Sequence, residues 1–397
     1  FELEGLPDSG VLRLEIHAED YLPIQRELPL PVGAPIVLHL VRLPPPVEIV
    51  VEAHLDSPHP SRQVLDRERV QKTPGTHDDP IRLIQSLPGV SLTPEYSPTA
   101  GALAIRGANP GESRVLFDGV ELPYLFHFQQ YASVIHTRML DELSVYPSGF
   151  GAAYGESVGG IVDVRSRKPE SGRVHGGANL NAIMAGGYLQ APVGDSGFSA
   201  SGRRSFMDAF ESSNDQYTLW PAFWDYLGRV ERDTGQGQRV AITVVGAGDT
   251  YGRYAGETES LDMVELSENP EIVYDRSFHG FIAQHSVTSG VWSSESVVGW
   301  VHDDWGAWLS TAEQSRVENA LTVRNQSTWW VRDGLSVDLG IEARTEWLQR
   351  FAQTDRAWPE IAAEAPLLSS GISVEEELST TLAGAWVEPR LEFGGLR

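Results

Sequence analysis

Apolar and polar residues alternate along the second half of the chain, in segments of about ten residues that recur from residue 173 onward. In the clearest segment, 336–346, one face carries Val337, Leu339, Ile341 and Ala343, and the other carries Asp338, Glu342, Arg344 and Glu346. Segment 316–328 has the same alternation. A period of two residues is that of a β-strand. We therefore expect an antiparallel sheet of about 8–10 strands over 169–397.

This alternation fits two fold classes. A soluble sandwich buries its apolar face, whereas a transmembrane barrel turns apolar residues to lipid and polar residues to its lumen. Six tryptophans lie near predicted strand ends: Trp292, Trp300, Trp305, Trp329, Trp330 and Trp347. Tryptophans gather in this way in the aromatic girdles of membrane barrels, and ordinary core tryptophans are the alternative. Segment 173–191 is rich in Gly, Ala and Asn, which suits a wall that another body approaches closely.

Residues 61–168 have a mixed α+β pattern. Short helices are predicted near 64–70 and 81–87, and Pro88-Gly89 ends the second of them. A third helix-like stretch covers 131–141. Strands are predicted near 102–106, 114–117, 142–146 and 160–166. The turn signal Asp118-Gly119 separates a strand from a loop that contains several aromatic residues.

The first sixty residues read as a small β-module followed by a linker. Residues 1–43 alternate weakly, and three prolines at 44–46 form a stiff spacer. The β-prone run 47–53 lies between prolines and suits pairing with the sheet edge of a partner, unless it is an ordinary strand of the first module. Because the chain begins at Phe1 and ends at Arg397 within a strand-like pattern, we expect a longer polypeptide or other chains to complete it.

Composition narrows the function classes. The 397 residues include 55 acidic and 30 basic side chains, and the net charge of −25 argues against non-specific nucleic-acid binding. The absence of cysteine excludes disulfides, cysteine-ligated zinc and thiol catalysis. No stretch of 18 apolar residues predicts a transmembrane helix.

No motif predicts an enzyme, a metal site or a cofactor. Residues 155–159 match the G-x-S-x-G elbow of hydrolases, but a strand is predicted after Ser157 where the elbow needs a helix. Gly246-Ala247-Gly248 hints at a dinucleotide loop, but the third glycine is misplaced and Asp249-Thr250-Tyr251 opens no helix. The acidic stretch 249–275 favours a solvated loop, with calcium binding as the alternative.

Four motifs in fixed order resemble the plug domain of TonB-dependent outer-membrane receptors. They are Ser86-Leu87-Pro88-Gly89-Val90, Ile105-Arg106-Gly107, Val115-Leu116-Phe117-Asp118-Gly119-Val120, and the ending formed by 148–155 and 159–164. The resemblance implies a mainly β protein in which an α+β plug, 61–168, lies inside a transmembrane antiparallel barrel. A plugged barrel of this kind has about 22 strands, so 169–397 would be its N-terminal part.

The segments before the plug also resemble the family. Glu48, Ile49, Val50, Val51, Glu52 and Ala53 are similar to a TonB box, the segment that pairs with TonB, although Glu52 stands where Thr or Ser is usual. The resemblance makes 44–60 a linker that carries this box. It makes 1–43 the tail of a β-sandwich-like, carboxypeptidase-regulatory-like extension.

Two sets of plug residues are the candidate site residues. Tyr124, Phe126, His127 and Phe128 form a loop after Pro123, for which a ligand-facing platform and a seal against the barrel wall are the two alternatives. The family motifs make Arg106, Gly107, Asp118, Gly119, Gly155, Gly159 and Gly160 structural residues of the plug. We expect Arg106 to pair with a lumen-facing acid, Glu342 or Glu346.

The function implied by the resemblance is import across the outer membrane of a Gram-negative bacterium, with energy delivered by TonB. The expected partners are TonB, outer-membrane lipid, a small-molecule or peptide ligand, and other envelope proteins. Two alternatives remain: a non-transport barrel in an envelope or motility complex, and a TonB-dependent signalling receptor. The sequence does not indicate the substrate.

Overall fold

The computed structural model describes residues 9–16, 24–30, 61–66, 73, 79–92, 103–109, 112–127, 132–169, 172–206, 217–219, 222–255, 271–309, 312–354 and 372–391. The chain divides into two units, residues 1–56 and 57–397. In the first unit, β1 (Gly10–Ile16) pairs antiparallel with β2 (Ile24–Leu30). Arg13 and Glu27 form a cross-strand ion pair of 2.6 Å. The TonB-box-like segment 48–53 lies outside the described residues.

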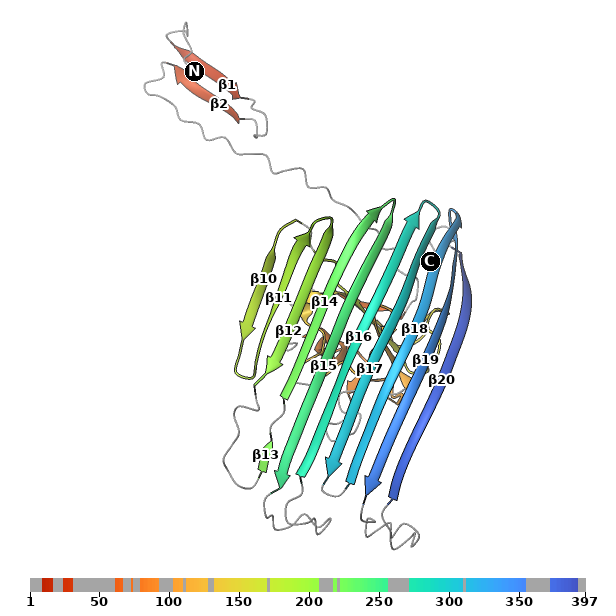
Figure 1. The fold of residues 1–397 in the computed structure, drawn as a ribbon. Helices are drawn as coiled ribbons and strands as arrows, with labels where there is room; N and C mark the ends of the chain where they lie inside the picture. The colour runs from red at the N-terminus through yellow and green to blue at the C-terminus, as the bar shows by residue number, and fades with distance from the viewer. Residues whose placement is uncertain are drawn as a thin grey trace. The chain divides into compact units, whose positions relative to one another are not determined.

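Ten long strands of the second unit form one antiparallel sheet, which we call the wall (Figure 1). Each strand pairs with the next in the chain, and the short β13 (Tyr217–Leu219) pairs with β15. The ten strands agree with the number predicted from the alternation. They are β10 (His175–Leu180), β11 (Met184–Val193), β12 (Ser196–Ser205), β14 (Ala222–Gly235), β15 (Gln238–Ala255), β16 (Glu271–Ser289), β17 (Trp292–Leu309), β18 (Ala312–Arg332), β19 (Leu335–Thr354) and β20 (Ile372–Leu391).

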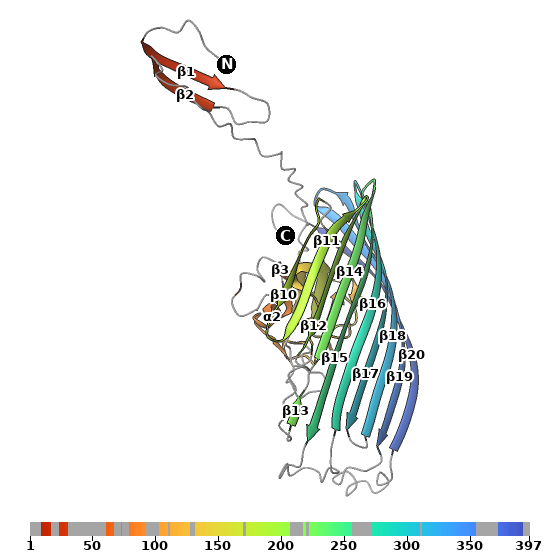
Figure 2. The same cartoon turned by 60° about the vertical axis from the view of Figure 1, so that its left-hand side comes forward.

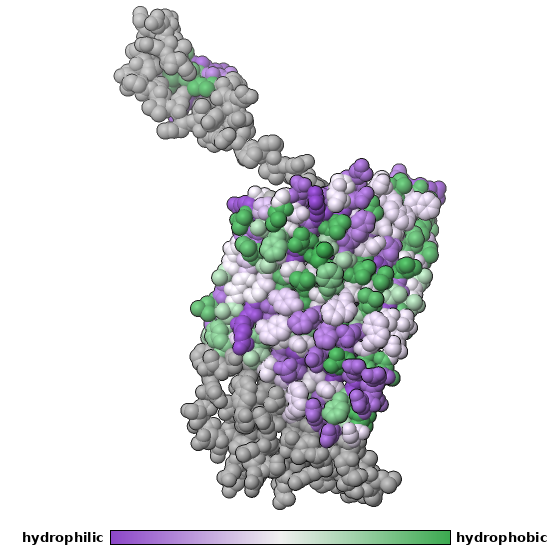
Figure 3. Space-filling model, in the orientation of Figure 1, coloured by the Kyte–Doolittle hydropathy of each residue, from purple (hydrophilic) through white to green (hydrophobic). Residues whose placement is uncertain are grey.

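The wall is apolar outside and polar inside. On β19, Ile341 is 56% exposed on the outer face, whereas Asp338 on the inner face is 3% exposed. Figure 3 shows apolar residues gathered on the outer face toward the end where short turns join β16 to β17 and β18 to β19. This is the alternation of a membrane barrel rather than that of a soluble sandwich. Among the described residues, no helix is long and apolar enough to cross a membrane.

Two exposed tryptophans mark the limits of a membrane-sized span on the outer face. Trp329 pairs with Val337, and Trp347 lies ten residues farther along β19. Transmembrane β-strands span about 9–11 residues between aromatic girdles, so this spacing fits one crossing. The girdle prediction does not extend to Trp305, whose ring contacts Tyr274 at 6.1 Å between centroids and whose position alternates to the inner face.

The plug precedes the wall in the chain and contains a five-stranded sheet in the order β3-β8-β9-β6-β7, in which only β6 and β9 pair in parallel. Figure 2 shows the wall curving around it. Its elements are β3 (Gln63–Asp66), α2 (Pro80–Gln85), β4 (Val90–Leu92), β5 (Leu103–Ile105), β6 (Arg114–Phe117), β7 (Val120–Glu121), the 3₁₀ turn η3 (Thr137–Met139), β8 (Leu140–Tyr146) and β9 (Ile161–Ser166).

Two of the three predicted plug helices are corrected by the structure. The expected helix near 64–70 begins instead as strand β3, which pairs with β8; residues 67–70 are outside the described residues. In the helix-like stretch 131–141, the described residues form only the turn η3 before β8 begins. Backbone pairing with neighbouring strands outweighs a short local helical pattern. The helix predicted at 81–87 and the four predicted strands are present.

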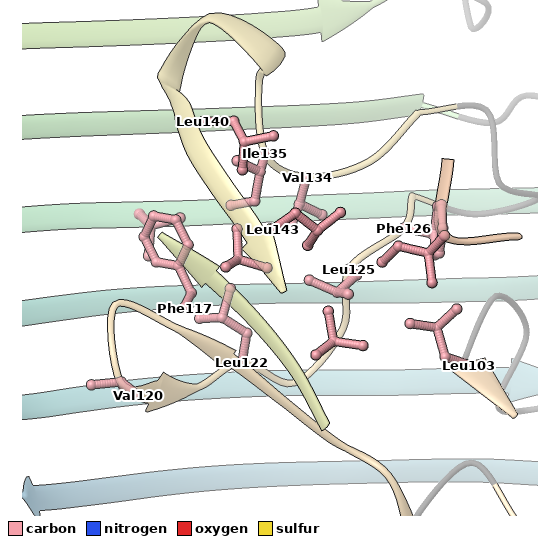
Figure 4. Packing of buried hydrophobic residues seen from close by; sticks show 14 of the residues in the cluster. Leu103, Phe117, Val120, Leu122, Leu125, Phe126, Val134, Ile135, Leu140 and Leu143 are labelled. Carbon is pink, nitrogen blue, oxygen red and sulfur yellow. The ribbon is translucent and has the colours of Figure 1, made fainter. Parts of the chain in front are cut away.

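The plug core is continuous with the inner face of the wall. Phe117, Ile105 and Leu143 are fully buried in the plug, and Figure 4 shows their neighbours in the same cluster. Side chains from four wall strands join this cluster: Leu227, Val245, Phe278, Ile282, Val297 and Val301. Burial of apolar surface therefore contributes to holding the plug against the wall.

Candidate functional site

His127 of the plug lies against two neighbouring strands of the wall, between a carboxylate from each. Its Nε2 is 3.1 Å from Asp225 Oδ2 on β14, and its Nδ1 is 3.0 Å from Asp249 Oδ1 on β15. The ring stacks on Phe223 with 4.3 Å between centroids. The side chains of His127, Asp225 and Asp249 are at most 4% exposed. Because both ring nitrogens face carboxylates, the protonated imidazole donates to both. We call His127, Asp225 and Asp249 the histidine clasp.

The charges around the clasp favour a protonated histidine. Burial lowers the pKa of His127, but the carboxylates of Asp249 and Asp225 outweigh it and raise this pKa to about 9. Arg203 on β12 also donates to Asp225, with Nε 2.9 Å from Oδ2. Two cations thus balance two buried carboxylates. At neutral pH the clasp is a charge-assisted link between plug and wall.

The other described residues of the aromatic loop pack rather than face solvent. Tyr124 meets Phe278 edge-on at 5.0 Å between centroids, and the Arg276 guanidinium lies 4.2 Å from its ring centroid. Phe126 is 4% exposed in the plug core. Phe128 lies outside the described residues. Tyr124 and His127 thus pack against the wall and Phe126 packs in the plug core, an arrangement that favours the seal over the ligand-facing platform.

A second link, which we call the charge cluster, joins the hairpin of β6 and β7 to β18 and β19. Its members are Arg114, Glu121, Arg324, Glu342 and Arg344. Arg114 Nη2 lies 2.7 Å from Glu342 Oε1, and its Nε lies 3.0 Å from Glu121 Oε2. Glu342 also pairs with Arg324 at 3.4 Å, and Arg344 donates to Glu121. The side chains of Arg114 and Arg324 are 6% and 7% exposed.

The expected pairing of Arg106 is wrong. Its Nη1 donates to Ser148 Oγ at 2.6 Å within the plug, and its backbone has a φ of 54°. Glu342 pairs with Arg114 instead, and Glu346 lies 2.7 Å from Arg344 Nε. The sequence did contain one signal for Arg114, because it starts a predicted strand that leads into the Asp118-Gly119 turn.

Asp118 anchors the hairpin turn. Its Oδ1 accepts from Ser166 N at 2.8 Å, and its Oδ2 accepts from Ser166 Oγ at 2.6 Å and from Arg229 Nη1 on β14 at 3.2 Å. Burial raises the pKa of Asp118, and the charge of Arg229 and the hydrogen bonds from Ser166 oppose that shift. The φ values of 48° at Asp118 and 83° at Gly119 suit the tight hairpin turn predicted from the sequence.

The glycines of the motif ending permit a close approach within the plug. A Cβ at Gly159 would lie 2.6 Å from Ser113 Oγ, and a Cβ at Gly160 would lie 2.8 Å from Ile105 Cδ1. A Cβ at Gly155 would meet no atom within 4 Å, and the carbonyl oxygen of Gly155 accepts a hydrogen bond from Arg114. Gly107 has a φ of 76°. Ser157 Oγ lies 3.0 Å from the carbonyl oxygens of Glu112 and Gly160, so its role is structural.

The hairpin of β6 and β7 contacts the wall at Gly299, a glycine that the sequence did not single out. A Cβ at Gly299 on β17 would overlap the side chain of Val120. The neighbouring Val297 packs on Gly119, since a Cβ there would lie 3.4 Å from Val297 Cγ2. Gly299 therefore permits the hairpin to lie directly on the wall.

Replacing Gly299 by leucine is expected to push the hairpin off the wall and to weaken plug docking by about 1–3 kcal/mol, the usual effect of overpacking. Limited proteolysis of the plug in the purified protein measures this. The matched control is Gly384→Leu on β20, where no atom lies within 4 Å of the Cβ position. Equal plug protection in both variants would show that the hairpin does not depend on this contact.

The described residues contain no group of three or more His, Asp or Glu side chains placed to hold a metal ion. Most of the acidic stretch 249–275 lies outside them. The described contacts hold oppositely charged side chains together at the buried interface between plug and wall. The plug thereby covers the concave side of the wall.

Comparison with known proteins identifies the plug. Residues 56–161 match the TonB-dependent Receptor Plug Domain family. No curated protein matches the sequence at a significant level.

Several solved structures share the fold. FpvA from Pseudomonas aeruginosa, in a structure bound to heterologous pyoverdines, matches with a TM-score of 0.62 and 12% identity over 86% of this chain and 50% of that one. The outer membrane transporter YddB from Escherichia coli matches with 0.58 and 11% identity over 84% and 55%. The ferric enterobactin receptor PfeA from P. aeruginosa matches with 0.57 and 14% identity over 85% and 56%. The chain thus spans about half the length of these proteins.

Proposed function

Because the chain carries a TonB-dependent receptor plug domain and has the fold of TonB-dependent outer-membrane receptors, we propose that it is part of a transporter that imports a ligand with energy from TonB. The observation that carries this proposal is the buried charged contact between plug and wall. Separating a buried ion pair costs about 3–5 kcal/mol when one partner is left alone. Opening a wall closed by several such pairs therefore needs work from outside the chain.

The proposed division of labour follows the predicted segments. Residues 48–53 pair with TonB as an added strand, the linker 44–60 transmits the pull, and the plug 61–168 rearranges. Residues 169–397 form the N-terminal part of a barrel in the outer membrane of a Gram-negative bacterium, and 1–43 end an extension. The outer face of the wall meets lipid. The ligand is a small molecule or a peptide, and no step of this function needs catalysis.

Deleting residues 48–53 is expected to abolish binding to TonB while leaving the protein in the outer membrane. The segment carries the backbone groups that would pair with TonB, and it precedes both the plug and the wall in the sequence. Co-isolation of TonB with the affinity-tagged protein, from cells that make the whole polypeptide, measures the first effect. Membrane fractionation measures the second.

The control for this experiment is deletion of residues 1–43, which keeps the segment and should leave co-isolation intact. If TonB is recovered equally well with and without 48–53, the proposed energy coupling through this segment is rejected. Loss of TonB on deletion of 1–43 alone would move the contact to the extension.

A further inference from the structure

The wall is fastened to the plug unevenly along its width. On β14 and β15 it holds the histidine clasp, and on β18 and β19 it holds the charge cluster. Arg229, also on β14, donates to Asp118, and Gly299 on β17, between the two links, receives the hairpin. These contacts are ionic or tightly packed. Separating them would leave buried charges unpaired or packed space unfilled, so opening this part of the interface has a high free-energy cost.

The inner face of β11 and β12 is built differently. Gln190 and Ser199 are 0% exposed and Ser201 is 8% exposed. The amide oxygen and nitrogen of Gln190 and the hydroxyls of Ser199 and Ser201 have no hydrogen-bond partner among the described residues. We call these three residues the polar seam. Buried polar groups are almost always hydrogen-bonded, so unpartnered amide and hydroxyl groups at one place indicate a surface made to bind water or a polar solute.

The plug meets this part of the wall through rings and a short turn. Tyr188 is on the same inner face of β11. Its ring centroid is 5.9 Å from the ring centroid of His136 and 5.9 Å from the guanidinium carbon of Arg138. His136 is the N-cap of η3, the turn Thr137–Met139, and Arg138 lies within that turn. Arg203 closes the seam at the end nearest the clasp, where it donates to the backbone oxygen of Ser133. Separating ring contacts leaves no buried charge unpaired.

We propose that the solute path opens along the polar seam, between η3 of the plug and strands β11 and β12. This inference rests on the proposed transport function and names the place and chemistry of the path. Amide and hydroxyl groups line it, so the solute it accommodates presents uncharged hydrogen-bonding groups there. The fastened part of the interface, from β14 to β19, stays in contact while η3 moves away.

The absence of cysteine makes this path directly testable. A cysteine at Ser199 reports on the seam, and a cysteine at Thr322 on β18 is its matched control. Register connects the two positions across the wall through Arg229, Thr243, Ile282 and Gly299. Both side chains are on the inner face of the wall and are buried, at 0% and 3% exposed.

The probe is a charged, membrane-impermeant maleimide added to intact cells that make Ser199→Cys or Thr322→Cys in the whole protein. Each variant is labelled with the proton gradient present and after its collapse by a protonophore. We expect the gradient to speed labelling of Ser199→Cys by about tenfold, equivalent to about 1.4 kcal/mol of opening, and to leave Thr322→Cys unchanged. Both substitutions are small, and outer-membrane yield verifies folding.

The outcomes separate the path from the transport function. Energy-dependent labelling at Ser199→Cys alone supports the seam. Equal energy-dependent labelling at both positions, or labelling at Thr322→Cys alone, overturns the seam but keeps energised opening of the plug. If the labelling rate at both positions is the same with and without the proton gradient, energised opening of the plug is rejected, and the proposed function is rejected with it.

Discussion

Replacing His127 by leucine is expected to weaken the attachment of the plug to the wall by about 3–5 kcal/mol, because Asp225 and Asp249 would remain buried without the imidazolium between them. Denaturant titration of the purified protein, followed by proteolysis of the plug, measures the loss. Leucine fills most of the space of the ring, so the missing charge is the main change.

The same contact predicts a pH dependence. The pKa of His127 is raised from 6.5 to about 9, so its stabilisation is fully present below pH 6.5 and is lost as the pH rises through about 9. The wild-type plug should therefore loosen between these values, and the His127→Leu plug should show no such step. Adding Asp249→Asn to His127→Leu should recover part of the loss. A wild-type plug that is equally stable at pH 6 and pH 10 would contradict the charged clasp.

Replacing Glu342 by glutamine is expected to have the second large effect, also about 3–5 kcal/mol, because it removes the carboxylate that the buried guanidinium groups of Arg114 and Arg324 share and leaves Glu121 as the described carboxylate beside Arg114. The same denaturant titration measures it. In a double-mutant cycle with Arg114→Met, the coupling energy should exceed about 1 kcal/mol, as expected for residues in one charged network.

The matched control is Glu346→Gln, four residues farther along β19 on the same face as Glu342. Its side chain is 32% exposed, and within the described part of the chain its ion pair is with Arg344, so the loss should be below about 1 kcal/mol. Additive effects of Arg114→Met and Glu342→Gln would show that this link does not hold the plug.

The alternation of polar and apolar residues was enough to predict the wall. In 336–346 the two sets of residues assigned from the sequence lie on opposite faces of the strand, with Asp338 inside and Ile341 outside. Period-two patterning constrains each strand locally, and antiparallel pairing of consecutive strands needs no long-range information. The Asp118-Gly119 turn was predictable for the same reason, because its geometry depends on two adjacent residues.

The partners across the plug–wall interface were not predictable from the sequence. Arg114 and Glu342 are 228 residues apart, and the pattern shows that both are polar without showing which wall strand faces which plug strand. Arg106 has the same charge as Arg114, but its side chain donates to Ser148 within the plug, a pairing that the sequence pattern does not indicate. His127 could be assigned to a loop, yet its burial depends on Asp225 and Asp249, which belong to strands far along the chain.

The most direct test of the account is the ionic conductance of the whole purified protein in a planar lipid bilayer. The account holds that the plug closes the barrel and that the clasp and the charge cluster keep it closed. The wild-type protein should therefore carry no current above background, and both His127→Leu and Glu342→Gln should leak. A wild-type protein that already conducts as much as these two variants would contradict the account.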